Sequence, residues 1–206
     1  MTTGLDPARW IDKPTLTGQL VQLRPFREED FDAIGEALAD PEVLRLTASV
    51  HSDSEAAGRP RSLDEVGLSW YRSRKDAPDR IDLAIVALLT SRCVGEAVLN
   101  DLDVENRSCN FRILIGPGAR DRGLGTEATR LLVTHGFEVL GLHRIALEVY
   151  AFNPRAQRAY EKGASRHECG LIQGSEPRRR SCGKTCSIGP SVSMMRPSAA
   201  LAEWKP

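Results

Sequence analysis

The chain has 206 residues, with 28 basic and 28 acidic side chains and a hydrophobic content of 41%. Such a composition is ordinary for one globular domain with a well-buried core. A net charge of zero supplies no field that would favour nucleic acid or an anionic membrane, and no apolar run reaches the ~20 residues of a transmembrane helix. The amino terminus lacks a signal-peptide pattern, and the five cysteines have no framework spacing, which is typical of a reducing compartment. We therefore expect a cytoplasmic protein, as a monomer or homodimer.

The first part of the chain predicts an amino-terminal lead-in, a strand, and two helices separated by a loop. Prolines favour an extended lead-in, and acidic residues before an apolar i, i+3, i+7 stripe favour a helix start. Ser62 followed by Glu65 indicates a capping box for the second helix. The expected elements are the lead-in over 1–17, a strand over 20–25, a helix over 28–40, a loop over 43–61 and a helix over 62–74. We assign residues 18–206 to one domain.

The middle of the chain predicts a meander of strands that leads into a helix, a strand and a further helix. Nearly continuous apolar sequence at 81–89 is typical of a strand buried on both faces, and the next strand returns across a short turn. The expected elements are strands over 81–89, 94–99, 111–115 and 144–150, a polar loop over 100–108, and helices over 126–140 and from Asn153 onward. A meander requires antiparallel neighbours, so the expected fold class is α/β with a mixed sheet.

A glycine-rich turn, Arg120-x-x-Gly123-x-Gly125, joins the strand at 111–115 to the following helix. Glycine lacks the side chain that would keep a ligand away from backbone N–H groups. The helix adds unpaired first-turn N–H groups and its positive dipole end, and together these features form an anion site best suited to phosphate. Arg120 and Arg122 can add charge-assisted bonds. The competing interpretation is an ordinary strand-to-helix loop in which the glycines only allow a tight turn.

The same segment also fits the dinucleotide pattern G-x-G-x-x-A over 123–128, with Glu148 about 20 residues further on. In a dinucleotide-binding fold the strand runs directly into the first glycine. Here residues 116–122 intervene, and Glu148 falls inside its strand rather than at the end. We therefore reject a nicotinamide-binding function.

The glycine turn, together with Asn153-Pro154 and with Tyr160 seven residues beyond Asn153, resembles the GNAT N-acetyltransferase superfamily. The closer similarity is to the ribosomal-protein-alanine acetyltransferase branch, and it extends from about residue 16 to residue 162. The resemblance implies a mixed, largely antiparallel central sheet, flanked by helices and splayed between the fourth and fifth strands. It also implies acetyl-CoA as cosubstrate, a primary amine as acceptor (a protein N-terminus or a small-molecule amine), and no metal.

The resemblance also assigns roles to individual residues. A backbone N–H near Leu114 would polarise the thioester carbonyl, Tyr160 would protonate the departing thiolate, and Asn153 would anchor cofactor amides or order its helix. The alternative for Tyr160 is an amphipathic core residue on a short helix. The amine attacks directly, so a carboxylate or a water chain must take its proton. The implied cofactor-binding residues are Ile113, Leu114 and Ile115 along pantetheine, Arg120, Asp121, Arg122, Gly123, Leu124, Gly125 and Thr126 around the pyrophosphate, and Asn153 and Arg155.

Three residues on the acceptor side bear on how the amine is handled. Many relatives carry glutamate at the position of Asn110 and glycine at that of Arg112. Asn110 cannot serve as a base, and Arg112 adds bulk or charge near the acceptor. Glu96 on the neighbouring strand is an alternative base, against the simpler interpretation of a solvated carboxylate on a strand face.

Residues 163–190 are atypical for the family because they are rich in glycine, serine and arginine and lack a strand pattern, which returns only at 192–195. We interpret this segment as a divergent or frame-altered replacement that leaves the acceptor pocket incomplete. Its histidine and cysteines match no common zinc spacing, so scattered thiols are preferred over a metal site. The alternative function is accordingly a catalytically impaired CoA-binding protein.

Overall fold

The computed structural model describes residues 5–6, 8–46, 60–150, 153–163, 170–171 and 183–188. The strands are β1 (Leu16–Thr17), β2 (Val21–Arg24), β3 (Ile81–Ala87), β4 (Arg92–Asp103), β5 (Ser108–Ile115), β6 (Arg144–Tyr150), β7 (Gly170–Leu171) and β8 (Gly183–Ile188). The helices are α1 (Ala8–Ile11), α2 (Phe31–Leu38), α3 (Pro41–Leu46), α5 (Glu65–Ser73), α6 (Leu124–Glu138) and α7 (Pro154–Gly163). Short 3-10 turns cover Glu28–Asp30, Arg74–Asp76 and Pro117–Ala119.

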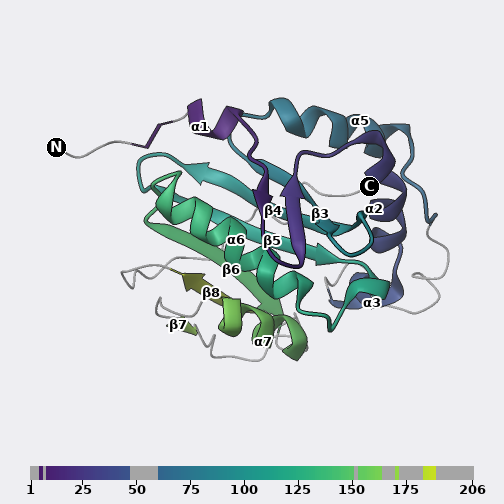
Figure 1. Ribbon diagram of the computed structural model, residues 1–206. Helices are drawn as coiled ribbons and strands as arrows, with labels where there is room; N and C mark the ends of the chain where they lie inside the picture. The colour runs from purple at the N-terminus through teal and green to yellow at the C-terminus, as the bar shows by residue number, and fades with distance from the viewer. Residues whose placement is uncertain are drawn as a thin grey trace.

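These strands form one sheet in the order β1-β2-β3-β4-β5-β6-β8-β7 (Figure 1). Neighbouring strands are antiparallel except for β5 and β6, which run parallel. The parallel pair is the one that a crossover helix, α6, connects, as parallel pairing requires. The predicted α/β class and the largely antiparallel mixed sheet are confirmed.

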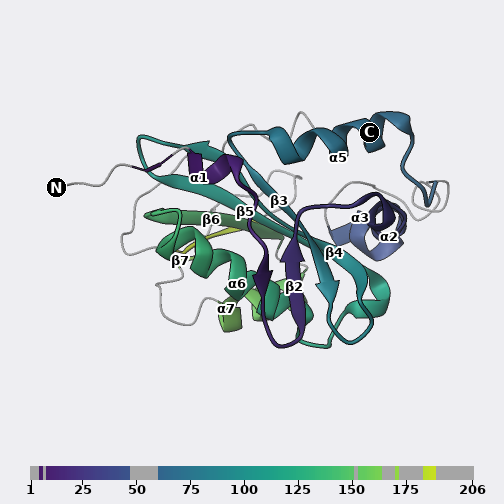
Figure 2. The ribbon, with the colours of Figure 1, turned by 45° about the horizontal axis from the view of Figure 1, so that its top comes forward.

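Helices lie on both sides of the sheet, and Figure 2 shows α5 and α6 on opposite sides of the strands. Alternate strand residues point to opposite faces, so Leu83 and Ala97 pack on the α6 side, in the main hydrophobic core. On the other side a smaller cluster joins Ile34 of α2 to Tyr71 of α5. The sheet is therefore a wall between two differently packed layers.

The strands β5 and β6 separate along their length. They pair from Ser108 with Arg144 to Asn110 with Ala146, and beyond that point no pairing between them occurs over the described residues. Because β5 continues to Ile115, its edge toward β6 is open there. This opening is the predicted splay between the fourth and fifth expected strands, and it is confirmed.

Two expectations for the first part of the chain are wrong. The lead-in is not extended throughout, because α1 forms a turn of helix whose Trp10 is fully buried in the main core. The start of the segment expected to be a loop, 43–61, is instead part of the helix α3. Asp40 accepts a hydrogen bond from the Val43 N–H at 3.0 Å, and Pro41 occupies the first helical position. Proline at that position starts a helix rather than ending one. The remainder of that loop, 47–59, lies outside the described residues.

Two further boundaries differ from expectation. The capping box expected at Ser62 is not formed, because α5 follows Asp64, whose side chain accepts the N–H of Gly67 at 2.8 Å. An aspartate is as good an N-cap as serine, and it lies next to the helix. The polar loop expected over 100–108 is reduced to a turn at 104–107, since amide and carboxylate side chains hydrogen-bond one another across the hairpin.

The carboxy-terminal segment contains strands that its sequence pattern did not predict. β8 pairs antiparallel with β6 from Ile145 with Ile188 to Tyr150 with Gly183, and β7 adds to its far edge. Backbone bonding to an available edge specifies these strands, since strand propensity depends strongly on context. The expectation that residues 163–190 lack strands is therefore wrong for β7 and β8. The strand expected at 192–195 lies outside the described residues.

Candidate active site

A cavity of about 360 Å³ opens where β5 and β6 separate. The open edge of β5, the first turn of α6, and α7 form its walls, and α3 contributes apolar side chains to one side. The predicted site residues in these walls are Ile113, Leu114, Ile115, Arg120, Asp121, Gly123, Leu124, Gly125, Thr126, Asn153, Arg155 and Tyr160. Arg122, the remaining predicted residue, is exposed in the turn outside the cavity wall.

The glycine turn brings backbone N–H groups into this cavity. Gly123 precedes α6 and has a φ of +78°, a left-handed conformation that side chains disfavour. At Gly125 a Cβ atom would lie 3.3 Å from Cγ1 of Ile115, so glycine there lets the helix begin close against β5. The first-turn N–H groups have no partner within the helix. With the helix dipole, they favour an anion at this end of the cavity.

The side chain of Arg120 is engaged within the protein. Its Nε donates to the carbonyl oxygen of Ile115 at 3.1 Å, and its terminal nitrogens bind Asp40 at 2.6 Å and also Glu42. Burial alone would raise the pKa of Asp40, but hydrogen bonds from Arg120 and from the Val43 N–H outweigh it and lower that pKa. These contacts engage all three guanidinium nitrogens, and a bond from Arg120 to a phosphate stays a prediction. This side chain braces the glycine turn against α3.

Three other arginines carry positive charge near the cavity. Arg155 of α7 pairs with Glu42 at 2.9 Å, and its side chain is 33% exposed. Arg158 lines the cavity one helical turn further on, and Arg122 is exposed in the turn before α6. Within the described residues, neither Arg158 nor Arg122 forms an ion pair. Our sequence analysis missed Arg158, although its i, i+3 spacing from Arg155 places both on one side of the helix.

Tyr160 and Asn153 both border the cavity, from α7 and its start. The Asn153 Oδ1 accepts the N–H of Ala156 at 3.1 Å, so this side chain orders the helix, which is one of the two roles considered for it. The Tyr160 ring meets Phe111 edge to face, with centroids 6.2 Å apart. Burial raises the pKa of Tyr160 to about 12, so its hydroxyl stays protonated at neutral pH. Tyr160 is thus a core residue and a cavity residue at once.

The backbone of Leu114 faces away from the open edge. The Gly116 N–H donates to the Val94 carbonyl at 2.8 Å, and Glu96 lies opposite Leu114 in the register of β4 and β5. Hydrogen-bonded and non-hydrogen-bonded pairs alternate along an antiparallel ladder. Since Val94 and Gly116 form a hydrogen-bonded pair, Glu96 and Leu114, two residues further on, form one as well, and their N–H and C=O groups point at each other. The N–H groups at the open edge are therefore those of the residues on either side of Leu114. The Leu114 N–H itself is therefore not at the open edge, and the oxyanion role near Leu114 stays a prediction.

Glu96 is not the solvated carboxylate of the simpler interpretation. Its side chain is 3% exposed, the Tyr71 hydroxyl donates to it at 3.1 Å, and Nη2 of Arg112 lies 3.1 Å away. Burial raises the pKa of Glu96, although the nearby Arg112 cation opposes that shift. Glu96 does not line the described cavity, so any effect of its charge on the cavity passes through the residues that it contacts.

A sheet that opens between two parallel strands, beside a glycine-capped helix start, offers a free strand edge and an anion site to an extended, phosphate-bearing ligand. The model of the acetyltransferase (GNAT) domain matches residues 21–163. Since this match covers more than half of the chain, the protein belongs to the GNAT acetyltransferase family.

Curated relatives include amine acetyltransferases. The spermidine N(1)-acetyltransferase of Vibrio cholerae is 30% identical over 80 residues, which make up 39% of this chain and 43% of that protein. The spermidine N(1)-acetyltransferase of Escherichia coli K12 is 30% identical over 88 residues, 43% of this chain and 47% of that protein. The uncharacterised N-acetyltransferase p20 of Bacillus licheniformis is 26% identical over 137 residues, 66% of this chain and 72% of that protein. The chain thus spans less than half the length of the spermidine relatives that it matches.

Solved structures share the fold. A GNAT-family acetyltransferase from Bacillus anthracis superposes with a TM-score of 0.62 at 18% identity, covering 84% of this chain and 96% of that one. The spermidine N-acetyltransferase of Vibrio cholerae, solved with CoA and spermine, gives a TM-score of 0.62 at 17% identity, covering 83% and 96%. The predicted superfamily is confirmed, whereas the ribosomal-protein-alanine branch stays a prediction.

Acetyl-CoA is the cosubstrate of this family, and the residues present fit it. The glycine-capped first turn of α6 suits a pyrophosphate, and the open edge of β5 suits the amide-bearing pantetheine arm. Within the described part of the chain, no group of three or more His, Cys, Asp or Glu side chains could hold a metal ion. The helices described there include none that is long and apolar enough to cross a bilayer.

Proposed function

We propose that the protein is an N-acetyltransferase that moves the acetyl group of acetyl-CoA to a primary amine by direct attack. The observation that carries this proposal is the single cavity shared by the open edge of β5, the glycine-capped start of α6 and Tyr160. These features supply a phosphate site, a strand edge and a proton donor, which are what acyl transfer from a CoA thioester requires. Membership of the family supports the same reaction class.

The chain holds the donor mainly with backbone groups. Acetyl-CoA supplies the activated acetyl group as a thioester. The N–H groups between Gly123 and Thr126 bind the pyrophosphate, and Arg122 and Arg155 add charge. An open-edge N–H of Ile113 or Ile115 polarises the thioester carbonyl, because a fixed donor stabilises the negative charge that develops on that oxygen.

The reaction needs a proton donor for the departing sulfur and a proton acceptor for the attacking amine. Tyr160 donates its phenolic proton to the departing sulfur, from the cavity wall in which its hydroxyl is held protonated. The attacking amine must be neutral, so its proton passes to a base or to water. The described cavity wall offers one carboxylate, Asp121 in the phosphate turn, so we propose that water takes this proton.

Two acceptor classes fit the proposal. The resemblance to the ribosomal-protein-alanine branch favours a protein N-terminus, whereas the spermidine relatives favour a small amine. We place the reaction in the cytoplasm, because Cys93 and Cys109 are free thiols and such unpaired cysteines suit a reducing compartment. We propose a monomer or homodimer as the active unit.

The alternative is a CoA-binding protein with impaired catalysis. One observation favours it. The family resemblance implies a glutamate at the position of Asn110, whereas the Asn110 amide donates to Asp101 at 2.8 Å and offers no base. Such a protein would bind acetyl-CoA without transferring the acetyl group.

Two measurements separate these functions. We expect acetyl-CoA to raise the Tm, because a ligand that binds only the native state stabilises it. We also expect free thiol to appear when a reactive amine is added. A rise in Tm without thiol release from any amine of a broad panel would favour the impaired CoA-binding protein. No rise in Tm with saturating acetyl-CoA would contradict both functions.

A further inference from the structure

Arg112 lies on the face of the sheet turned away from α6. It stands two residues before Leu114 on β5, and alternate strand residues share a face. Leu114 packs with Ala37 and Val43, and both Leu114 and Val43 line the cavity. We call the surface formed by Glu96, Arg112 and Leu114 the acceptor face. Arg112 does not itself line the cavity, but its side chain is 44% exposed and it lies two residues from Leu114, which does.

The chemistry of the proposed reaction directs the amine to the acceptor face. Tyr160 packs in the main core on the α6 side of the sheet, and the phosphate site is at the start of α6. An amine adds to a thioester carbonyl carbon from one face of its trigonal plane, so it needs a part of the cavity that the cofactor and Tyr160 do not fill. We assign to the amine the side lined by Leu114 and Val43, and Arg112 lies on the same face of the sheet, two residues before Leu114.

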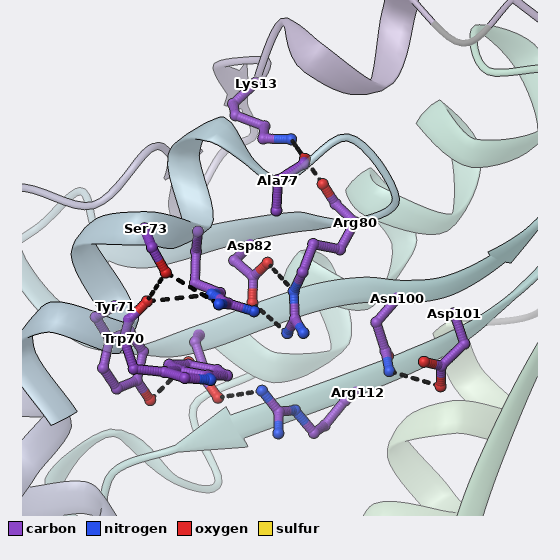
Figure 3. Close-up of polar contacts among 12 residues, drawn as sticks. Lys13, Trp70, Tyr71, Ser73, Ala77, Arg80, Asp82, Asn100, Asp101 and Arg112 are labelled. Atoms are coloured by element: carbon purple, nitrogen blue, oxygen red, sulfur yellow. Dashed lines mark hydrogen bonds and ion pairs between the residues drawn. The ribbon is translucent and has the colours of Figure 1, made fainter. Parts of the chain in front are cut away.

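The guanidinium of Arg112 contacts the buried Glu96 carboxylate on one side and is exposed on the other. Its Nη2 lies 3.1 Å from a carboxylate oxygen of Glu96, which is 3% exposed, while the Arg112 side chain is 44% exposed. The Tyr71 hydroxyl holds the other oxygen of Glu96 at 3.1 Å. Figure 3 shows Arg112 reaching toward Tyr71 and Trp70. A guanidinium has five N–H donors, so a single anchoring contact leaves several of them for a ligand.

The other buried charges near Arg112 are already matched. Arg80 donates to both oxygens of Asp82, at 2.6 and 2.8 Å, and the Asp82 side chain has no exposure. Both buried carboxylates of this region, Asp82 and Glu96, therefore have an arginine partner. Of the two arginines that pair with them, Arg112 is the more exposed, at 44% of its side chain against 16% for Arg80.

Two exposed carboxylates on this side of the sheet bear on the acceptor: Glu42 of α3 is already paired with Arg120 and Arg155, and Asp101 lies farther from the cavity. Asp101 accepts hydrogen bonds from the side-chain amides of Asn100 and Asn110, each at 2.8 Å. Along β5, Asn110 is four residues from Leu114, and Arg112 lies between them. An acceptor that enters the cavity thus meets the positive charge of Arg112 before the negative charge of Asp101.

We propose that Arg112 binds a carboxylate of the acceptor, so that the preferred acceptor is an amine that carries a carboxylate rather than a polyamine. This inference rests on the proposed acetyl transfer. The planar guanidinium pairs with carboxylates through two parallel hydrogen bonds, and a fixed cation repels the second ammonium group of a diamine. On this point the chain would differ from its spermidine-acetylating relatives.

Matched acceptors test the selectivity of the wild-type enzyme. β-Alanine and 4-aminobutyrate are each compared with the diamine in which an ammonium replaces the carboxylate, 1,2-diaminoethane and 1,3-diaminopropane, and lysine is compared with 1,5-diaminopentane, which lacks only the carboxylate. We expect kcat/KM, from thiol release, to favour the aminocarboxylates by about tenfold or more. Higher kcat/KM for the diamines would overturn the inference and leave acetyl transfer standing. Thiol release from no amine at all would instead contradict the proposed function.

Variants of Arg112 test whether this side chain is the cause. Arg112→Gln should raise KM for the aminocarboxylates about 10- to 100-fold, with KM for acetyl-CoA and for diamines unchanged or improved. Arg112→Lys, which keeps the charge without the fork, should retain part of the selectivity. Arg92→Gln is the matched control, because Arg92 is an exposed arginine on the neighbouring strand. Should Arg112→Gln not fold, Arg112→Lys decides the same question.

Three results would contradict a role for Arg112 in acceptor binding. One is an equal loss of activity toward both acceptor classes in Arg112→Gln. Another is the same change of selectivity in Arg92→Gln. The third is a higher KM for acetyl-CoA in Arg112→Gln, which would assign Arg112 to the donor.

Discussion

Tyr160 is nearly buried yet borders the cavity, and this position sets its expected behaviour. We expect Tyr160→Phe to lower kcat by about 100-fold, the usual size of a lost general acid. The affinity for acetyl-CoA should persist, because the ring and its contact with Phe111 remain. Thiol-release kinetics and a titration with acetyl-CoA measure the two quantities. Turnover equal to that of the wild type would remove Tyr160 from the proton-donor role.

Gly123 and Gly141 share a left-handed backbone, with φ values of +78° and +76°, but only Gly123 lines the cavity. Alanine at either position should reduce the free energy of unfolding by about 1–2 kcal/mol. We expect Gly123→Ala also to weaken acetyl-CoA binding about tenfold, because the N–H groups of the helix start move. Chemical denaturation and acetyl-CoA titration measure the two effects.

Gly118→Ala and Gly141→Ala are the controls for this prediction. Gly118 lies in the same segment, and no heavy atom would come within 4 Å of an added Cβ, so alanine there should change neither quantity. Gly141→Ala should reduce stability alone. An equal loss of acetyl-CoA affinity in Gly123→Ala and Gly141→Ala would show that general destabilisation is the cause.

At the scale of the elements, Glu127 joins α6 to the turn between β1 and β2. Its carboxylate accepts three backbone N–H bonds, from Gln19 at 3.0 Å, Leu20 at 2.6 Å and Val21 at 2.9 Å. Burial alone would raise the pKa of Glu127, but these bonds outweigh it and leave the pKa below its ordinary value. The helix whose start is the proposed phosphate site is thereby held to the sheet by its own first-turn carboxylate.

Glu127→Gln should destabilise the protein in a pH-dependent way. A depressed folded-state pKa stabilises the protein above the unfolded value of about 4.3, and this contribution is lost as the pH falls through the lower folded value. We expect the variant to lose about 2 kcal/mol at neutral pH. Its Tm should also fall less than that of the wild type between neutral pH and about pH 3.

Glu138→Gln is the control for this pH dependence, because Glu138 is an exposed glutamate in the same helix. Thermal melts over a series of pH values measure both variants and the wild type. Parallel curves of Tm against pH for Glu127→Gln and the wild type would contradict the stabilising role of the Glu127 carboxylate.

At the scale of the whole molecule, the sheet is closed on the β4 side of β5 and open on the β6 side. We expect acetyl-CoA to slow amide hydrogen exchange at Ile113, Ile115 and 123–126. The Leu114 N–H, which already points at β4, should exchange slowly with or without the ligand. Exchange in β2 and β3 should not change. Residue-resolved exchange measures this pattern. Ligand-dependent protection at Leu114, with none at Ile113 and Ile115, would refute the assignment of the Leu114 N–H to the β4 side.

Local signals predicted the elements whose cause is local. The apolar run of β3, the glycine turn and the polar cap of α7 each depend on a few consecutive residues, and the structure contains all three. One missed feature is also local, because Pro41 begins α3 next to its cap, Asp40. The other missed features depend on distant partners, since β8 exists because β6 offers an edge. Glu96 is buried because Tyr71 and Arg112 close over it.

The sequence by itself determined the proposed donor side of this protein, because the glycines and the helix start of the proposed phosphate site are contained in one short segment, Arg120–Thr126. The tertiary structure alone decided which charges are available. Arg120 is neutralised by acids about 80 residues away, whereas Arg112 stays partly exposed. It also decided which N–H groups face the ligand. Strand phase and ion pairing arise between segments far apart in the chain, so no local pattern encodes them.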